Sequence, residues 1–230
     1  MSDLPPAPAP LAPRFMYLHG FASGPNSTKG LALSRHFEPL GVHIERLNLR
    51  VPSFEELKLS AITDTVRAAL GGKQDRVVLL GSSLGGLTAA RVAAEDARVC
   101  GLVLMAPAFH IVTQLRKRMG EALWEHWRTT GWIPTEDFVE KRTSKVHWGF
   151  VEDALALDER LGNWPDVRVP TLLIHGRADD TCDIANSRRW AQGRRNVKLV
   201  EVDDGHELTA SLPFILEQTE AFLRPWGGSA

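Results

Sequence analysis

A serine lies between two glycines at the point where an apolar run gives way to a helix-like stretch. The segment Gly81-Ser82-Ser83-Leu84-Gly85 has the pattern G-x-S-x-G, with Ser83 at its apex. The preceding residues 76–80 and the following residues 87–94 predict a sharp strand-to-helix turn, which strains the serine backbone and needs glycine where other backbone comes close. The pattern also occurs in ordinary strand-to-helix turns, so the rest of the sequence must show whether Ser83 is catalytic. Ser83 is the candidate nucleophile, because Ser82 has no glycine two places before it.

Candidate acids follow a second apolar run. The apolar run at 169–174 is followed by the pattern H-G-x-x-D at 175–179, and three carboxylates, Asp179, Asp180 and Asp183, come after the run. The carboxyl ends of strands are where ligand sites form in α/β proteins. The spacing selects Asp179 as the acid that would orient a histidine. Asp180 and Asp183 are interpreted as loop caps or as charges at the start of a helix.

A histidine follows the last β-like run, residues 197–201, in the loop Val202-Asp203-Asp204-Gly205-His206. An imidazole can take a proton from a serine hydroxyl and return it to a leaving group, while a carboxylate holds the ring. The chain order Ser83, Asp179, His206 is one of the orders in which such a set of groups occurs. These three residues are predicted to act as the nucleophile, the orienting acid and the base of one catalytic site.

Together, these motifs resemble those of the α/β-hydrolase superfamily over residues 14–224. The sequence is similar to the small bacterial YqiA-like esterases, whose stretches Y-L-H-G-F and G-S-S-L-G-G occur here at 17–21 and 81–86. It also resembles an abhydrolase-domain enzyme known both as mycophenolic acid acyl-glucuronide esterase and as palmitoyl-protein thioesterase. That likeness includes Asn26-x-Thr28-Lys29 and His175-Gly176 with the pair Asp179-Asp180. The resemblance implies an α/β-hydrolase fold.

The α/β-hydrolase arrangement also implies an oxyanion hole. Two backbone N–H groups bind the negative oxygen of the tetrahedral intermediate, one after the nucleophile and one after an early core strand. Here these positions are Leu84 and Phe21, and Gly20 permits a close approach of the backbone to substrate. His19 lies at the end of the strand and is interpreted as an organiser of this loop rather than as a proton carrier.

Around these motifs, apolar runs and helical patterns alternate along the chain. Strands are expected at 15–18, 42–49, 76–80, 99–105, 171–174 and 197–202. Helices are expected at 28–40, from a capping box Ser53-x-x-Glu56 to about residue 70, after the serine turn, at 184–192 and at 210–223. Repeated βαβ units predict a mostly parallel sheet of about six strands flanked by helices.

An insertion, residues 108–165, interrupts this alternation and holds five of the seven tryptophans. Leu115, Met119, Leu123 and Trp127 recur at helical spacing and predict a small helical cap whose apolar face mainly packs on the core. Caps at this position in the superfamily cover the catalytic pocket, so one or two aromatic residues are expected to line an acyl or aryl site. The candidates for this role are Phe109, Trp124, Trp127 and Trp132.

The composition of the 230-residue chain, 43% hydrophobic, predicts one domain over 14–230. Residues 1–13 are rich in proline and are expected to form a disordered arm, and their composition predicts neither a secretory signal nor a membrane anchor. The net charge of -1 predicts no broad attraction to nucleic acid or membrane, and no run is long enough to span a bilayer. Cys100 and Cys182 have neither disulfide-framework nor metal spacing, which favours a cytoplasmic protein.

The function predicted from these residues is a serine hydrolase that cleaves a small-molecule carboxylic ester or thioester through an acyl-enzyme. No cofactor and no metal is expected. Carbon–carbon bond hydrolysis, acyl transfer and cofactor-free perhydrolysis use the same three side chains and stay open as alternatives. A non-catalytic binding module of the same fold is the other alternative. The patterns define neither the physiological substrate nor the oligomeric state.

Overall fold

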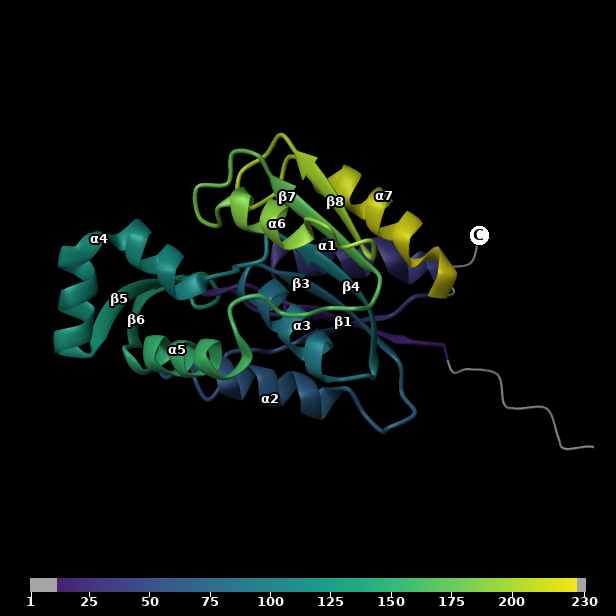
Figure 1. The fold of residues 1–230 in the computed structure, drawn as a ribbon. Helices are drawn as coiled ribbons and strands as arrows, with labels where there is room; N and C mark the ends of the chain where they lie inside the picture. Colours follow the sequence, from purple (N-terminus) through teal and green to yellow (C-terminus); the bar gives the residue numbers. More distant parts are fainter. Residues whose placement is uncertain (1–11, 227–230) are drawn as a thin grey trace, which may run out of the picture.

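The computed structural model describes residues 12–226 and has a central sheet of six parallel strands, in the order β2-β1-β3-β4-β7-β8 (Figure 1). The strands are β1 (Arg14–Leu18), β2 (Ile44–Leu47), β3 (Val77–Ser82), β4 (Val99–Met105), β7 (Thr171–Gly176) and β8 (Val197–Val202). All six strands expected from the sequence are present, and the parallel sheet is confirmed. The arm expected over 1–13 lies outside the described residues, except for positions 12 and 13.

Residues 12–226 contain seven helices, of which five flank the sheet and two belong to the insertion. They are α1 (Thr28–Phe37), α2 (Leu59–Ala69), α3 (Leu84–Glu95), α4 (Ile111–Thr130), α5 (Gly149–Leu161), α6 (Ile184–Ala191) and α7 (Leu212–Leu223). Short 3-10 turns follow α1 at Glu38–Leu40 and α7 at Arg224–Trp226.

The alternation of side chains along β3 divides the core into two layers. Val77 and Leu79 point into the layer that contains residues of α2 and α3, whereas Val78 and Leu80 point into the layer that contains residues of α1 and α7. Successive residues of a strand face opposite sides of a sheet, so a fully buried strand needs helices on both faces. Loops lie at the edge of the sheet formed by the carboxyl ends of the strands.

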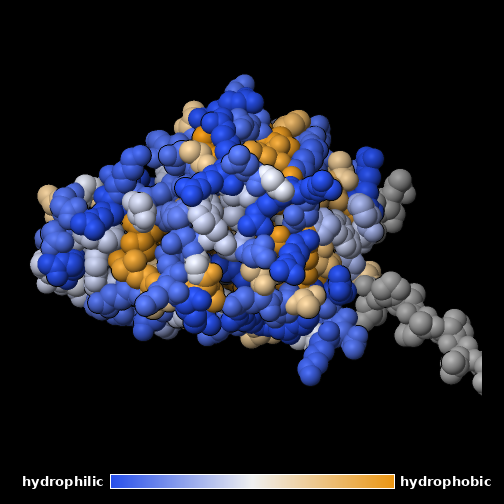
Figure 2. Space-filling model, viewed as in Figure 1, coloured by the Kyte–Doolittle hydropathy of each residue, from blue (hydrophilic) through white to orange (hydrophobic). Residues whose placement is uncertain are grey.

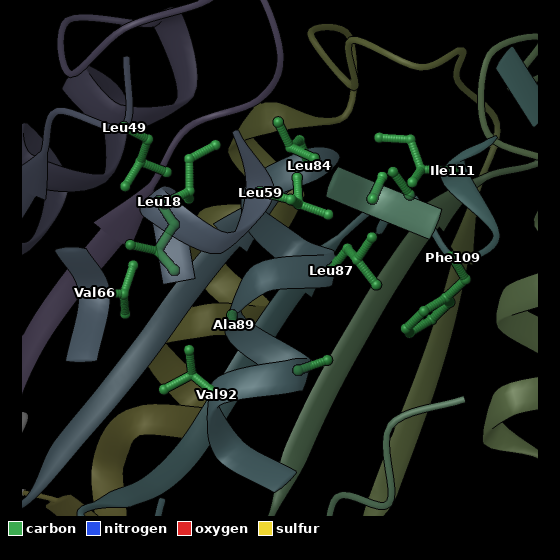
Figure 3. Packing of buried hydrophobic residues seen from close by; sticks show 14 of the residues in the cluster. Leu18, Leu49, Leu59, Val66, Leu84, Leu87, Ala89, Val92, Phe109 and Ile111 are labelled. Atoms are coloured by element: carbon green, nitrogen blue, oxygen red, sulfur yellow. The ribbon is translucent and has the colours of Figure 1, made fainter. Parts of the chain in front are cut away.

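Helix α3, which follows the serine turn, is fixed by close packing on one of these layers. Leu84, Leu87 and Val92 of this helix are at most 2% exposed and point into the cluster that Figure 3 shows. Leu59 of α2 is completely buried in the same cluster. Burying one such side chain contributes about 1.5–3 kcal/mol, so the start of α3 has little freedom to move.

The capping box expected at Ser53 forms a turn and does not begin a helix. Ser53 Oγ accepts the Glu56 N–H at 3.1 Å, but α2 begins only at Leu59, after the extended residue Lys58. Asp153, a residue of α5, caps the helix instead by accepting the Ser60 N–H at 2.8 Å. A partner 93 residues away replaces the local one.

The insertion contains two helices, α4 and α5, and between them a hairpin of two antiparallel strands, β5 (Trp132–Asp137) and β6 (Arg142–His147). It lies to one side of the sheet (Figure 1). The sequence predicted helices here but not the hairpin. Both strands of a two-stranded sheet are edges, where proline and charged residues are tolerated, so the hairpin lacks the apolar runs that mark the central strands.

Hydrophilic side chains cover most of the face that Figure 2 shows, with hydrophobic side chains in separate small patches. Within residues 12–226, none of the helices combines the length and the apolar character that a membrane crossing needs. The large hydrophobic side chains that are exposed are Leu123, Phe138, Val139, Leu155 and Phe214.

Candidate active site

Ser83 lies on the sharp turn between β3 and α3 with a backbone φ of 53°. This left-handed conformation is disfavoured for a residue with a side chain and persists only where surrounding structure imposes it. Gly81 and Gly85 make the turn possible. A Cβ at Gly81 would lie 2.4 Å from the Gly85 carbonyl oxygen, and one at Gly85 would lie 2.1 Å from that of Leu18. The pattern G-x-S-x-G is therefore a steric requirement of this turn.

Hydrogen bonds from neighbouring backbone hold the serine in place. The Ser83 N–H donates to the Met105 carbonyl at 2.9 Å, and the Ser83 carbonyl accepts the Ala108 N–H at 3.0 Å. Both partners lie at the end of the adjacent strand β4 or just after it. The half-buried Ser83 side chain is thereby presented at the carboxyl edge of the sheet.

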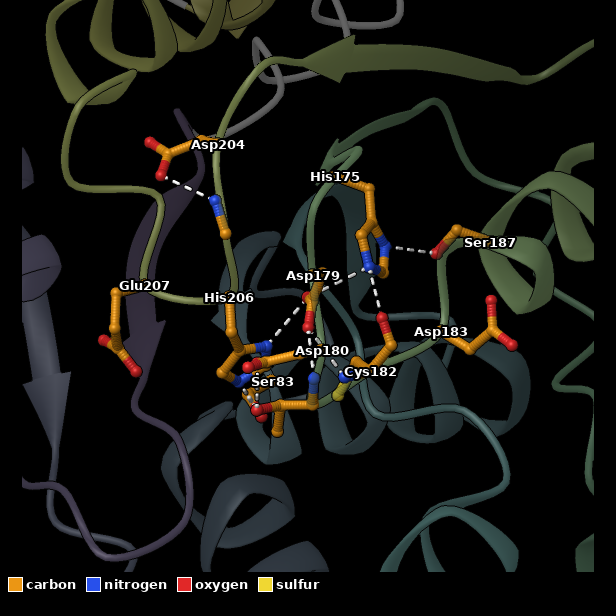
Figure 4. Close-up of polar contacts among 12 residues, drawn as sticks. Ser83, His175, Asp179, Asp180, Cys182, Asp183, Ser187, Asp204, His206 and Glu207 are labelled. Carbon is orange, nitrogen blue, oxygen red and sulfur yellow. Dashed lines mark hydrogen bonds and ion pairs between the residues drawn. The ribbon is translucent and has the colours of Figure 1, made fainter. Parts of the chain in front are cut away.

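His206 lies between Ser83 and Asp179 (Figure 4). Its Nε2 is 3.1 Å from Ser83 Oγ, and its Nδ1 is 2.8 Å from Asp179 Oδ2. Because an ionised carboxylate only accepts hydrogen bonds, Nδ1 carries the proton, and in the neutral ring Nε2 is free to accept from the serine hydroxyl. The structure thus brings together the three residues that the sequence selected.

Asp179 is a buried carboxylate with donors on both oxygens. Oδ1 accepts the N–H groups of Thr181 and Cys182 at 2.8 and 2.7 Å, while Oδ2 faces His206 and His175. Burial alone would raise the pKa of Asp179, but the donated hydrogen bonds from His175, His206 and Cys182 outweigh it and hold the pKa well below its usual value. Asp179 is therefore ionised at neutral pH.

His175 is the second imidazole at Asp179, and the sequence showed it only as part of a motif. Its side chain is completely buried, with Nε2 2.9 Å from the Cys182 carbonyl and 3.1 Å from Asp179 Oδ2. Both oxygens only accept, so Nε2 carries a proton. Its Nδ1 is 2.8 Å from Ser187 Oγ on α6. His175 thus links the acid loop to the helix that follows it.

The neighbouring acids have the structural positions expected from the sequence. Asp183 is the N-cap of α6, where its Oδ1 accepts the Ala185 N–H at 2.9 Å. Asp180 is exposed, and its Oδ1 accepts the Thr181 hydroxyl at 3.2 Å. Within the described residues 12–226, neither carboxylate is bonded to His206.

The loop that carries His206 is anchored on both sides. Before the histidine, Asp204 accepts the N–H groups of Gly205 and Ser211 at 2.7 and 2.8 Å. After it, the buried Lys29 ammonium donates to the Glu207 carbonyl at 2.7 Å. Lys29 belongs to the Asn26-x-Thr28-Lys29 motif quoted from the sequence, and this contact gives that residue a physical role.

Leu84 and Phe21, the residues expected to form an oxyanion hole, flank the serine. Leu84 is the first residue of α3, where backbone N–H groups have no partner within the helix and the helix dipole favours negative charge. Phe21 follows Gly20, and a Cβ at Gly20 would lie 3.3 Å from Ser83 Cβ. Within residues 12–226, neither N–H donates to a protein acceptor. Both positions therefore fit the prediction, and their role in binding an oxyanion remains a proposal.

His19 organises the loop that contains Phe21, as the sequence predicted. It is 3% exposed; Nδ1 lies 2.9 Å from the Gly20 carbonyl, and Nε2 accepts the Leu49 N–H at 3.0 Å. Nδ1 must be the protonated nitrogen, because the carbonyl only accepts. Burial lowers the pKa of His19 and so favours this neutral form. The imidazole connects the loops after β1 and β2.

A family comparison places the chain among known sequences. Residues 14–223 match the family described as "Uncharacterised protein family (UPF0227)". The chain belongs to the UPF0227 family. A search of curated protein sequences found no match.

Solved structures similar to this UPF0227 chain show the α/β-hydrolase fold. Mouse alpha/beta hydrolase domain-containing protein 10 is 18% identical, with a TM-score of 0.74 and coverage of 94% of this chain and 92% of the other. The esterase Est1E from Butyrivibrio proteoclasticus, with ferulic acid bound, is 20% identical, with a TM-score of 0.74 and coverage of 97% and 93%. A Pyrococcus furiosus esterase is 16% identical, with a TM-score of 0.66 and coverage of 94% and 84%. These neighbours confirm the α/β-hydrolase fold that the sequence predicted. The family match supports the resemblance to the YqiA-like proteins.

Three of the four aromatic residues proposed to bind substrate are buried in this UPF0227 chain. Phe109 is completely buried, with its ring centroid 5.0 Å from that of Trp190. Trp127 is 2% exposed and donates its indole N–H to the Val146 carbonyl at 2.9 Å. Trp124 is 5% exposed and contributes to the wall of a groove of about 590 Å³ that also involves α5.

The fourth aromatic candidate, Trp132, is half-buried on the hairpin. Its ring centroid is 4.8 Å from that of His147, and the Lys145 ammonium lies 4.2 Å from it. Trp124 alone among the four lines the 590 Å³ groove. The substrate-binding roles of all four residues remain predictions.

Cys182 lies in the same loop as Asp179, and burial favours the neutral form of its thiol. Burial, followed by the charge of Asp179, raises the pKa of Cys182 to about 12. A thiol acts as a nucleophile through its thiolate, which is scarce here at neutral pH. The buried thiol of Cys182 is therefore a poor nucleophile at neutral pH.

Proposed function

We propose that this protein is a serine hydrolase that cleaves carboxylic esters or thioesters through an acyl-enzyme on Ser83. The observation that carries the proposal is the line of contacts from Ser83 Oγ through His206 to the buried Asp179, at 3.1 and 2.8 Å. Such a set of nucleophile, base and orienting acid is recognised by its geometry. The esterases among the structural neighbours support the same class of reaction.

In the proposed first half-reaction, Ser83 Oγ attacks the acyl carbon while His206 Nε2 takes the hydroxyl proton. The carbonyl oxygen becomes an oxyanion, which accepts hydrogen bonds from the N–H groups of Phe21 and Leu84. Collapse of this intermediate breaks the bond to the alcohol or thiol, which receives the proton from His206. The acyl group then remains on Ser83.

In the second half-reaction, water attacks the acyl-enzyme and gives its proton to His206. Collapse of the second tetrahedral intermediate releases the carboxylic acid, and His206 returns the proton to Ser83 Oγ. Asp179 stays ionised throughout and stabilises the imidazolium. The acyl-transfer and perhydrolysis alternatives differ only in the acceptor, an alcohol or hydrogen peroxide in place of water.

A panel of p-nitrophenyl esters and matched thioesters of increasing acyl length tests the proposal. The native protein is expected to hydrolyse members of the panel, and Ser83→Ala to lose the activity. Ser82→Ala is the matched control, because Ser82 is the buried neighbour outside the line of contacts. Product analysis with added alcohol or peroxide distinguishes ester hydrolysis from acyl transfer and perhydrolysis. A native protein that turns over no ester or thioester would contradict the proposal and favour a binding module.

A further inference from the structure

The hairpin of the insertion is bonded directly to the loop that carries Phe21. The Phe138 N–H at the tip of the hairpin donates to the Ala22 carbonyl at 3.2 Å. Val139 packs so closely on the same loop that a Cβ at Gly24 would lie 2.8 Å from its Cγ2. The contacts therefore begin at the residue directly after Phe21.

Ala22 has a backbone conformation that needs such support. Its φ is 59°, in the left-handed region that residues with a side chain rarely adopt. A conformation of this kind persists where neighbouring groups over-determine it. The hydrogen bond from Phe138 fixes the Ala22 carbonyl. The N–H of the same peptide group, that of Ser23, donates at 3.3 Å to the Gly20 carbonyl, which shares a peptide group with the Phe21 N–H.

A buried carboxylate holds the tip of the hairpin in turn. Asp137 is completely buried, and its Oδ1 accepts the N–H groups of Val139 and Glu140 at 3.0 and 3.1 Å. The guanidinium of Arg50 donates to both carboxylate oxygens, at 3.0 and 2.6 Å. One side chain therefore closes the hairpin and ties it to the loop after β2.

Arg50 also contacts the surroundings of Phe21 through Phe54, independently of the hairpin. Its guanidinium lies 4.5 Å from the ring centroid of Phe54, and that ring is 6.2 Å from the ring of Phe21. Arg50, Phe21 and Leu84 also border one small cavity of about 10 Å³. The ion pair of Arg50 with Asp137 thus contacts the Phe21 loop through the hairpin and through Phe54.

We infer that Asp137 and Arg50 are positioning residues for the oxyanion hole, holding the Phe21 N–H in place through the hairpin of the insertion. This inference rests on the proposed function. On this inference, the insertion supports the chemical step. Because oxyanion contacts strengthen as negative charge develops, loss of the ion pair is expected to lower kcat and to leave KM nearly unchanged.

The test compares Asp137→Asn with Asp158→Asn. Asp158 of α5 pairs with the buried Arg91 of α3, so it also joins the insertion to the core through a charged contact. Reactive sites are titrated with a fluorophosphonate, and kcat is expressed per titrated site, so that unfolded protein does not count. Affinity for a boronic acid, which forms a tetrahedral adduct with the serine, is measured for each variant.

Removing one oxyanion donor typically costs about 10²–10³-fold in kcat, and a displaced donor costs less. Asp137→Asn is expected to lose at least about tenfold in kcat per site and in boronic acid affinity, with KM within about threefold of native. Asp158→Asn is expected to retain native values per site. If Asp137→Asn fails to fold, Arg50→Lys keeps the charge opposite Asp137 and is expected to lose at least about threefold in kcat.

Native kcat per site in a folded Asp137→Asn protein, or in Arg50→Lys where only that variant folds, would overturn the inference. An equal loss in Asp158→Asn would also overturn it, because any broken contact between insertion and core would then suffice. If the native protein itself neither reacts with the fluorophosphonate nor turns over esters, the proposed function has failed rather than the role of the ion pair.

Discussion

His175 Nε2 lies 3.1 Å from Oδ2 of Asp179, the oxygen that also faces the Nδ1–H of His206. The carboxylate is therefore held between two imidazoles, of which only His206 reaches the serine. His175 is completely buried and also bonded to the Cys182 carbonyl, so it restrains the loop as well as the acid.

We expect His175→Leu to lower kcat by about 10-fold to 100-fold, because a misplaced acid no longer orients His206. His175→Gln should lose less, since an amide N–H can replace the donor near the position of Nε2. Steady-state kinetics on folded variants measures the difference. Native kcat in His175→Leu would show that the contact with Asp179 has no influence on the chemistry.

Asp179→Asn is expected to lower kcat by about 10⁴-fold, because an amide favours the wrong imidazole tautomer. The control is Asp180→Asn, which changes an exposed neighbour and should leave kcat within about twofold of native. The two variants have the same chemical change one residue apart. A larger loss of kcat in Asp180→Asn than in Asp179→Asn would identify Asp180 as the orienting acid.

The ratio kcat/KM should fall on the acid side of the pH profile, because His206 accepts the serine proton only when its ring is neutral. Asp179 adds no second ionisation there, because the pKa of its carboxyl lies well below its usual value and it stays charged as pH falls. A pH profile between about 5 and 9 is therefore expected to show one step on the acid side. His206→Ala should be inactive throughout, and an unchanged profile in that variant would identify another base.

Trp127 is expected to matter for stability more than for substrate choice. It is 2% exposed, and Trp127→Ala removes a large core side chain together with its bond to the Val146 carbonyl. Such a change costs about 3–5 kcal/mol, or about 6–20 °C in Tm for a chain of this size. Leu123→Ala on the same helix changes a side chain that is 53% exposed and should shift Tm little. Thermal unfolding followed by circular dichroism compares them, and an unchanged Tm in Trp127→Ala would show that this packing is not needed.

The sheet and the positions of Ser83, Asp179 and His206 could be predicted because each depends on a local pattern. A buried strand followed by glycines, or by the pattern H-G-x-x-D, specifies its own turn. The parallel order of strands then brings the loops to one edge of the sheet. At these three turns, the structure predicted from the local sequence is the one that the fold adopts.

The insertion was less predictable, because its contacts join residues far apart in sequence. Arg50 and Asp137 are separated by 87 residues, and nothing near either of them indicates the other. The hairpin around Asp137 consists of two edge strands with polar faces, whereas the helical spacing of Leu115, Met119, Leu123 and Trp127 predicted helices in the insertion. The predicted cap of α2 was wrong for a related reason. The helix is capped by Asp153 of the insertion, which is far from it in sequence, and not by Ser53.

Reaction with a fluorophosphonate followed by mass spectrometry of the intact protein and its peptides tests the central claim most directly. One adduct per chain is expected, on the peptide that contains Ser83, together with no adduct in Ser83→Ala and native labelling in Ser82→Ala. No adduct on the native protein, or an adduct that persists in Ser83→Ala, would contradict the assignment of Ser83 as the nucleophile.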